Sequence, residues 1–141
     1  GGAGLTIAKL RTAKQTFDLA SVDPSIPRHI VVGPEQITNL LSTTEVTSSD
    51  FNTVKALVQG EIDSFLGFKF TVSNRLAKSG NDRTCIAFAQ DGITLAIGKD
   101  VSARIDERAD KSYATQVYYC QSIGATRMEE AKVLGIVCQE A

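Results

Sequence analysis

Few residues in this sequence combine the type and the spacing that acid–base or metal chemistry requires. His29 is the only histidine, so a Ser-His-Asp triad or a histidine-containing metal site would have to be built around it. Glu61 and Asp63 stand two residues apart and would share one face of a strand, which suits a metal ion or paired acid–base work. No G-x-S-x-G turn supplies a nucleophile for His29. We therefore predict a structural role for His29 and a solvated strand face for the two carboxylates, and we keep a small α+β enzyme or ligand-binding domain as the alternative.

Motifs that bind phosphate or calcium are also missing from the sequence. It contains no G-x-G-x-x-G, no G-x-x-x-x-G-K-[ST] and no EF-hand spacing. Acidic residues from Asp106 onward alternate with Arg104, Arg108 and Lys111, which is typical of a salt-bridged exposed tip. We expect no catalytic residue, no cofactor and no metal ion.

One polar loop collects positive charge, in the side chains of Arg75, Lys78 and Arg83. No aromatic residues are interleaved with them, and the chain as a whole has 15 basic and 16 acidic residues, a formal net charge of -1. That balance provides no field to attract DNA, RNA or an anionic membrane. We interpret the three cations as solvated charge, with charge-paired contact between subunits and nucleic-acid contact as alternatives. No sequence-specific nucleic-acid partner is expected.

Apolar runs and the amino terminus bear on where the protein resides. No run approaches the roughly 20 apolar residues of a membrane span, and no basic-then-apolar signal peptide begins the chain. Met128 is the only methionine, so Gly1 is not an initiator, and Gly1 to Gly4 fit a cloning scar, a processing site or a glycine-rich loop. We expect a cytosolic fragment with no membrane partner.

The first half of the chain predicts helices around one short strand. Apolar residues recur every three or four positions near the start, prolines interrupt the next segment, and a β-branched run follows. The predicted elements are a helix over 6–18 capped by Thr6, a loop over 22–27, a strand over 28–32, a helix that starts at Gly33-Pro34 and carries Ile37, Leu40 and Leu41, and a helix from Asp50 to Gly60.

The second half predicts mostly strands, because its apolar residues alternate or run continuously between turn signals. With the first half, this gives one α+β domain of ordinary size at 141 residues. The predicted elements are strands over 68–72, 84–89, 101–105, 113–125 and 132–139, a bend at Gly67, a turn at Gly80-Asn81-Asp82, a short helix that Asp91 caps and that carries Ile93, Leu95, Ala96 and Ile97, and an exposed turn over 106–111.

Cysteines and tyrosines add two expectations about packing. Cys85, Cys120 and Cys138 are odd in number and lie in apolar stretches, which indicates buried thiols and not a disulfide framework. Tyr118 and Tyr119 must point to opposite faces of their strand. One of those faces needs a partner, which is either another layer of the same core or a neighbouring subunit.

Several phrases of the sequence resemble the carboxy-terminal half of tailed-phage major capsid proteins of the Hong Kong 97-like fold. The phrases are LTIAKL at 5–10, PRHIVVGP at 27–34, GEIDSFLGF at 60–68 followed by VSN at 72–74, and GATR at 124–127 before VLGIV at 133–137. The resemblance covers almost the whole chain. The family's amino-terminal arm, its extended loop and most of its spine helix have no counterpart in it.

The resemblance implies a mixed central sheet flanked by short helices and preceded by the end of a long spine helix. Residues 1–20 would be the glycine-rich start and the end of the spine helix, and residues 21–141 would be the axial domain with the closing strands. Copies of the chain would form pentamers and hexamers of an icosahedral shell around DNA, with scaffold and portal proteins as further partners, in the virion and in the host cytoplasm during assembly. An encapsulin-like nanocompartment shell is the alternative within this fold. The candidate subunit contacts are Arg75, Lys78, Arg83, Arg104, Asp106, Arg108 and Lys111.

Overall fold

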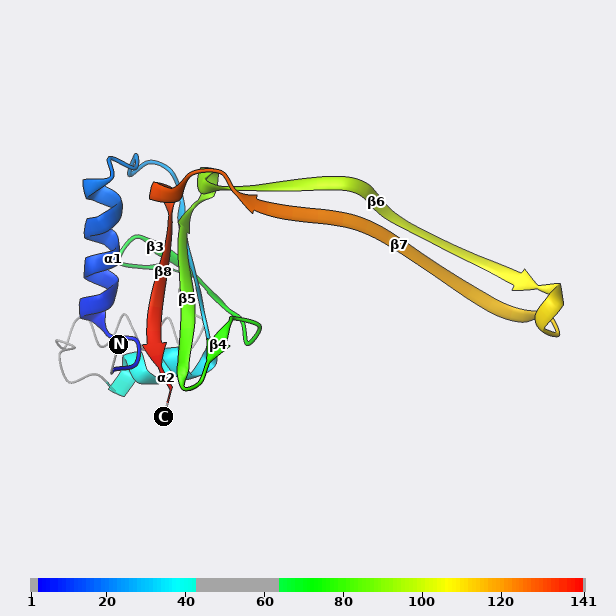
Figure 1. The fold of residues 1–141 in the computed structure, drawn as a ribbon, viewed down its shortest axis with the longest axis horizontal. Coiled ribbons are helices and arrows are strands. Elements are labelled where there is room, and N and C mark those ends of the chain that lie inside the picture. Colours follow the sequence, from blue (N-terminus) through cyan, green and yellow to red (C-terminus); the bar gives the residue numbers. More distant parts are fainter. Residues whose placement is uncertain (1–2, 43–63, 141) are drawn as a thin grey trace.

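The computed structural model shows a mixed sheet with helices packed on it and a long two-stranded arm that leaves it (Figure 1). The structure describes residues 3–42 and 64–140. The predicted helix from Asp50 and the pair Glu61 and Asp63 lie outside these ranges. The described elements are α1 (Ile7–Leu19), β1 (Arg28–Val32), α2 (Pro34–Ser42), β2 (Ser64–Phe65), β3 (Phe68–Val72), β4 (Lys78–Ser79), β5 (Asp82–Ala89), β6 (Ile93–Arg108), β7 (Ala114–Arg127) and β8 (Val133–Gln139), with short 3₁₀ turns at Gln90–Gly92, Ala109–Lys111 and Glu130–Lys132.

Helix α1 confirms the amphipathic pattern predicted for residues 6–18. The Thr6 hydroxyl accepts the backbone N–H of Lys9 at 3.3 Å, so the cap satisfies one of the free donors at the helix start. The apolar stripe of the helix is buried and consists of Ile7, Leu10, Ala13 and Phe17. Neither helix in the described part of the chain combines the length and the apolarity that a bilayer span requires.

The strands of the main sheet are hydrogen-bonded in the order β2, β3, β1, β5 and β4, and β8 also pairs along β5. Strand β1 runs parallel to β3 and antiparallel to β5, which confirms the predicted mixed sheet. The predicted bend at Gly67 is the turn of the β2–β3 hairpin, where Leu66 and Gly67 have φ values of 53° and 84°. Two successive left-handed residues match the twist of the paired strands, and glycine adopts this conformation without strain.

One face of the sheet forms the core together with α1. Strand β1 alternates between buried Arg28, Ile30 and Val32 and half-buried residues between them. Phe17 of α1 lies 5.9 Å from Phe68 of β3, between ring centroids, and the Arg28 guanidinium lies 5.6 Å from the centre of the Phe17 ring. Arg28 Nη2 donates to Asp18 Oδ1 at 2.8 Å, so its buried charge is paired. Helix and sheet are therefore joined by apolar packing and by one paired cation.

The opposite face of the sheet is only partly covered. We call it the outer sheet face, and its side chains come from alternate positions of β1, β5 and β8, namely His29, Val31, Ile86, Phe88, Val133 and Val137, with Gly135 among them. Ile86 is 37% exposed and Val137 is 44% exposed. His29 stacks on Phe88 with ring centroids 5.5 Å apart. The predicted structural role of His29 fits this contact.

The short helix predicted after Asp91 is wrong, because residues 93–97 are the first part of strand β6. Asp91 lies in a 3₁₀ turn, and Ile93, Leu95 and Ile97 pair with the returning strand β7. Their spacing of two is a strand period, and the cross-strand partners decide between the two possibilities. The predicted turn over 106–111 is also shifted, because β6 continues to Arg108 and the chain reverses at the tip through Ser112 and Tyr113, which have φ values of 53° and 58°.

The three cysteines are free thiols, as predicted. Cys85 on β5 and Cys138 on β8 are buried in the core. Contact with the Cys138 thiol and burial both raise the pKa of the Cys85 thiol, so it stays protonated at neutral pH. Cys120 differs, because it is only half-buried on β7 opposite Ser102. Burial was predicted correctly for two of the three.

The main sheet together with α1 and α2 forms what we call the body. Glu140 holds the end of β8 to the rest of this body. Its carboxylate is 2% exposed and forms ion pairs with Arg83 and Lys78. The Gln36 side chain of α2 donates to Glu140 Oε1 at 3.2 Å, and Arg83 Nη1 donates to the Asn74 carbonyl oxygen at 3.1 Å. Hydrogen bonds from Arg83 and then from Lys78 lower the pKa of Glu140 to about 2. One buried carboxylate thus joins β8, β5, β4 and α2.

We expect Phe17→Ala to destabilise the body strongly. Phe17 is fully buried against Phe68 and the Arg28 guanidinium, and truncation of a buried phenylalanine costs about 3–5 kcal/mol. Leu19→Ala on the same helix is the control, because Leu19 is 78% exposed and should cost no more than about 0.5 kcal/mol. Urea unfolding followed by circular dichroism measures both. Equal losses for the two variants would contradict the packing described here.

Acid should weaken the body through Glu140. The pKa of Glu140 is lowered from 4.5 to about 2 in the folded state, so its stabilising contribution is complete above pH 4.5 and is lost as the pH falls toward 2. Glu140→Gln should therefore remove stability at pH 7 and flatten the dependence of unfolding free energy on pH between these two values. Glu107→Gln, at an exposed position of β6, is the control. If Glu140→Gln kept the wild-type slope of unfolding free energy against pH, the ion pairs of Glu140 could not be the source of that slope.

Candidate subunit-contact surface

Strands β6 and β7 form a two-stranded arm that carries no other described strand on either edge. Their pairing runs from Ile93 opposite Arg127 at the root to Arg108 opposite Ala114 near the tip. Figure 1 shows the arm leaving the end of β5 and extending away from the main sheet. No second layer of strands packs on this ribbon in residues 3–42 and 64–140, so its two faces differ in the side chains they present.

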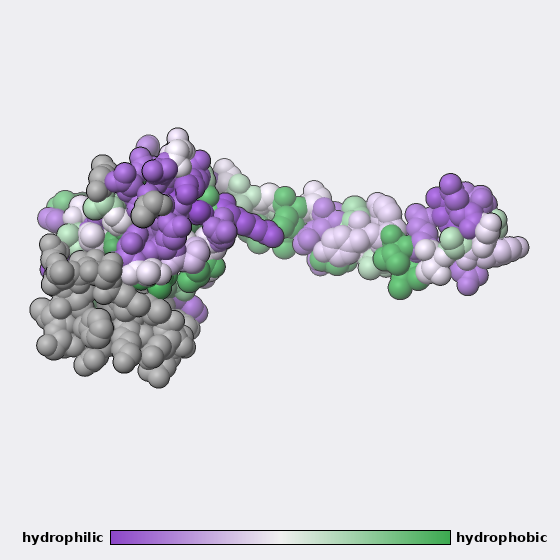
Figure 2. All heavy atoms as spheres, turned by 90° about the horizontal axis from the view of Figure 1, so that it is seen from below, coloured by the Kyte–Doolittle hydropathy of each residue, from purple (hydrophilic) through white to green (hydrophobic). Residues whose placement is uncertain are grey.

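One face of the arm carries most of its large apolar side chains, from Leu95 near the root to Ile105 and Val117 toward the tip. Directly paired residues share a face, and alternate residues of each strand lie on opposite faces. The register therefore gathers six large apolar side chains on one side, each between 57% and 71% exposed. We call this the apolar arm face, and its residues are Leu95, Ile97, Ile105, Val117, Tyr119 and Ile123. Figure 2 shows apolar side chains at intervals along the arm, outside the body.

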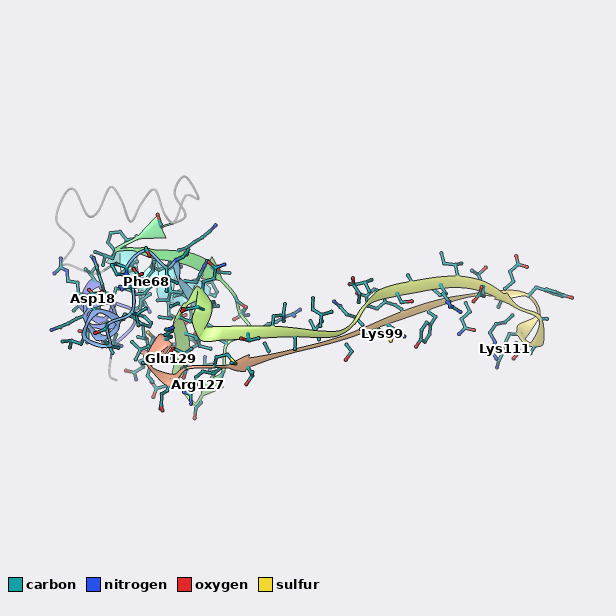
Figure 3. All side chains as sticks on the ribbon, turned by 90° about the horizontal axis from the view of Figure 1, so that it is seen from above. Asp18, Phe68, Lys99, Lys111, Arg127 and Glu129 are labelled. Carbon is teal, nitrogen blue, oxygen red and sulfur yellow. The ribbon has the colours of Figure 1, made fainter. Side chains whose placement is uncertain are left out.

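The opposite face of the arm is polar and carries three predicted contact residues. Arg104, Asp106 and Arg108 lie together there, opposite Tyr118, Gln116 and Ala114. Arg108 Nη2 also bonds Asp110 Oδ2 of the tip at 2.5 Å, and Lys111 lies at the tip itself (Figure 3). Tyr118 is on this polar face and Tyr119 on the apolar one, which confirms their predicted divergence.

Two register shifts interrupt β6 near the middle of the arm. They fall between Ile97 and Lys99 and between Lys99 and Ser102. Each adds one residue to β6, and a single added residue would move every following side chain to the other face. Because there are two shifts, Ile105 returns to the same face as Ile97. The shifts therefore preserve the apolar arm face.

The root of the arm is fixed to the body by short contacts. Lys132 Nζ bonds Asp91 Oδ2 at 2.6 Å and Glu129 Oε2 at 2.8 Å, and these bonds raise the pKa of Lys132 to about 12. The Met128 N–H donates to the Gly92 carbonyl oxygen at 3.0 Å. A Cβ on Gly92 would lie 2.8 Å from Lys132 Cβ, so the close approach at the root requires glycine.

The other predicted contact residues lie on the body, away from the arm. Lys78 and Arg83 are both paired with Glu140, so their charge is used within the chain. Arg75 is exposed in the loop between β3 and β4. The structure therefore separates the seven predicted residues into an arm group and a body group. Sequence reasoning missed the apolar arm face, whose signal was the alternation of Leu95 with Ile97 and of Val117 with Tyr119.

The described residues contain no group of three or more His, Cys, Asp and Glu side chains able to hold a metal ion. A groove of about 420 Å³ lies between α1 and β8. Its lining is Ala8, Lys9, Thr12, Ala13, Thr16 and residues 134–137, so Lys9 is its only ionisable side chain. This lining lacks the convergent polar groups of a catalytic pocket.

Several solved structures resemble this chain over most of its length. No curated protein matches the chain. Among solved structures, one from Mycobacterium phage Che8 has 19% sequence identity and a TM-score of 0.68, over 94% of this chain and 52% of that one. The capsid structure of the cyanophage P-SCSP1u has 14% identity and a TM-score of 0.68, over 100% of this chain and 54% of that one. A virus-like particle from Pyrococcus furiosus has 15% identity and a TM-score of 0.53, over 96% and 55%.

The chain thus spans about half the length of the solved structures that it resembles. These likenesses confirm the predicted α+β class and the Hong Kong 97-like fold. The family model described as phage capsid protein matches residues 1–140, which is nearly the whole sequence. The chain belongs to the phage capsid protein family.

Proposed function

We propose that the chain is the shell-forming part of a major capsid protein, and that its arm packs on neighbouring subunits. Copies would assemble into pentamers and hexamers and then into an icosahedral shell around DNA. Scaffold and portal proteins are further partners in this proposal. The protein would reside in the virion, and in the host cytoplasm during assembly.

The apolar arm face is the observation that carries this proposal. Its six side chains are each more than half exposed, and together they present on the order of 600 Å² of apolar surface, the upper end of what a soluble monomer shows. A two-stranded ribbon is at best marginally stable in water unless another layer covers it. A partner that covers this face stabilises the arm and the assembly together.

Copies of the same chain are the partner that fits a capsid protein. A contact between two different surfaces of identical subunits generates rings when the rotation closes, and many modest contacts then sum to a stable particle. The formal net charge of -1 gives no general attraction to DNA, so the shell would enclose DNA without binding its sequence. Nothing in this role requires a catalytic residue, and we propose that the chain is not an enzyme.

The predicted contact residues have distinct places in this proposal. Arg104, Asp106, Arg108 and Lys111 would form charge-paired contacts from the polar face and tip of the arm, and Arg75 would do so from its loop. Lys78 and Arg83 would act indirectly, because their bonds to Glu140 shape the corner between β4 and β5. We also keep the division into residues 1–20 and 21–141 as a proposal, although α1 and the sheet share one core.

An encapsulin-like nanocompartment shell is the second candidate. The observation in its favour is the likeness to the Pyrococcus furiosus virus-like particle, whose TM-score of 0.53 is below the 0.68 of the two phage structures. Neighbouring genes separate the candidates, because a phage gene lies beside portal, protease and packaging genes and an encapsulin gene lies beside its cargo enzyme. A ligand-binding or catalytic domain has less support, since His29 packs on Phe88 and the groove between α1 and β8 has Lys9 as its only ionisable side chain.

Tyr119→Asp should weaken assembly, whereas Tyr118→Asp should leave it nearly unchanged. Both tyrosines are exposed on β7, but only Tyr119 lies on the apolar arm face. An unpaired buried carboxylate costs several kcal/mol, so the concentration needed for assembly should rise at least ~10-fold in Tyr119→Asp. Electron microscopy and sedimentation of the natural full-length product measure this, with circular dichroism as the folding control. Equal assembly by both variants would overturn the proposed role of the arm.

A further inference from the structure

Strand β8 lies at an edge of the main sheet, and its unpaired side faces α1. Among the described strands it pairs only with β5, and the Glu140 N–H, on the paired side, donates to the Asn81 carbonyl oxygen. Alternate residues of a strand turn their backbone groups to the same side, so those of residues 133, 135, 137 and 139 turn outward. This edge is a feature of the single copy, apart from the proposed shell function.

An open strand edge is a hazard, because its unpaired N–H and C=O groups can pair with a strand of another molecule. Proteins often protect such an edge with a proline, a charged residue or a bulge in the strand. The seven residues of β8, VLGIVCQ, include neither proline nor a charged residue, and their register with β5 is regular. The groove of about 420 Å³ between α1 and β8 lies beside the edge, so the helix leaves room there. Protection therefore has to come from residues outside the strand.

Lys9 and Ala3 cover the carboxyl-terminal part of this edge. Lys9 Nζ donates to the Val137 carbonyl oxygen at 2.9 Å and to the Ala3 carbonyl oxygen at 2.6 Å. The Gln139 N–H donates to the same Ala3 oxygen at 3.1 Å. At the other end of β8, the Val133 N–H donates within the 3₁₀ turn that precedes the strand. In the described part of the chain, the open groups of the edge therefore lie between Val133 and Val137.

Gly4 allows the segment before α1 to reach this position. An added Cβ on Gly4 would lie 2.4 Å from Nδ2 and 2.9 Å from Cβ of Asn39 on α2, so a larger residue would push the segment outward. The next residue, Leu5, is fully buried, and Thr6 caps α1. The segment is thus held against α2, in the core and on β8 at successive points.

We propose that Ala3 and Lys9 form a clasp that protects the edge of β8 against strand addition. The clasp shortens the open edge from the seven residues of β8 to the stretch around Gly135, which is too short to pair stably with another strand. The Lys9 ammonium adds a second barrier, because an incoming strand would have to displace a charge that already has two carbonyl partners. A copy with an open clasp adds strands at β8 and aggregates.

Lys9→Met tests the clasp, because methionine keeps an unbranched apolar chain and removes the donors. In free subunits of the natural full-length product, we expect the Gln139 amide to exchange at least ~10-fold faster and aggregates that bind thioflavin T to form. Lys14→Met is the control, because Lys14 is exposed on the same helix and lies outside the clasp. Faster exchange without aggregation, or equal behaviour of the two variants, would overturn the proposed protection.

Gly135→Pro separates an open edge from a simple loss of stability. The Gly135 N–H turns outward, so proline removes no bond to β5 and blocks the edge to an incoming strand. Lys9→Met combined with Gly135→Pro should therefore stay soluble although the clasp is open. If this double variant aggregated as fast as Lys9→Met, Lys9 would act through stability alone and the clasp would be refuted.

Gly4→Val opens the clasp from its other side, and it decides the question if the proline variant does not fold by circular dichroism. It should aggregate as Lys9→Met does, because the added side chain cannot fit against Asn39. Gly124→Val is the matched control, since nothing lies within 4 Å of a Cβ at that position. A soluble Gly4→Val, or equal aggregation of the two valine variants, would contradict the clasp.

Discussion

A two-stranded ribbon cannot bury the side chains of either face unless something packs against it, and β6 and β7 form such a ribbon. Most other features of this chain follow from that constraint. The register collects six large apolar residues of the arm on one face, the two shifts in β6 keep them there, and Arg104, Asp106 and Arg108 occupy the other face. The arm is therefore arranged so that one of its faces can be covered, and our proposal assigns this cover to another copy of the chain.

The body of the molecule has the packed core that the arm lacks. Its core joins α1 to the sheet through Phe17 and Phe68, and the Glu140 cluster holds the end of β8 in place. Lys132, in the turn between β7 and β8, bonds Asp91, in the turn before β6, and so joins the two ends of the arm at its root. A rigid root means that little freedom is lost when the arm binds, and preorganisation of this kind raises affinity without added area.

Much of the body could be predicted from local patterns. Thr6 and the apolar stripe of α1 identify a helix. The β-branched run of β1 and the alternation in β3 identify strands whose bounds agree with the structure. Residues 93–97 could not be assigned in the same way, because a short apolar run between Asp91 and Gly98 fits a helix or a strand, and the deciding partner is β7, more than twenty residues later. Arg83 and Lys78 looked free because their partner, Glu140, is distant in sequence. The apolar arm face likewise emerges only from the register of two strands.

The central claim is that the arm depends on a neighbouring copy for its stability, and hydrogen–deuterium exchange of free subunits and assembled particles tests it directly. In free subunits, amides of β6 and β7 should exchange nearly as fast as in an unstructured chain, while those of β1, β5 and β8 stay protected. In particles, the arm should become strongly protected along its length. Equal protection of the arm in both states, or an unprotected arm in intact particles, would contradict the account.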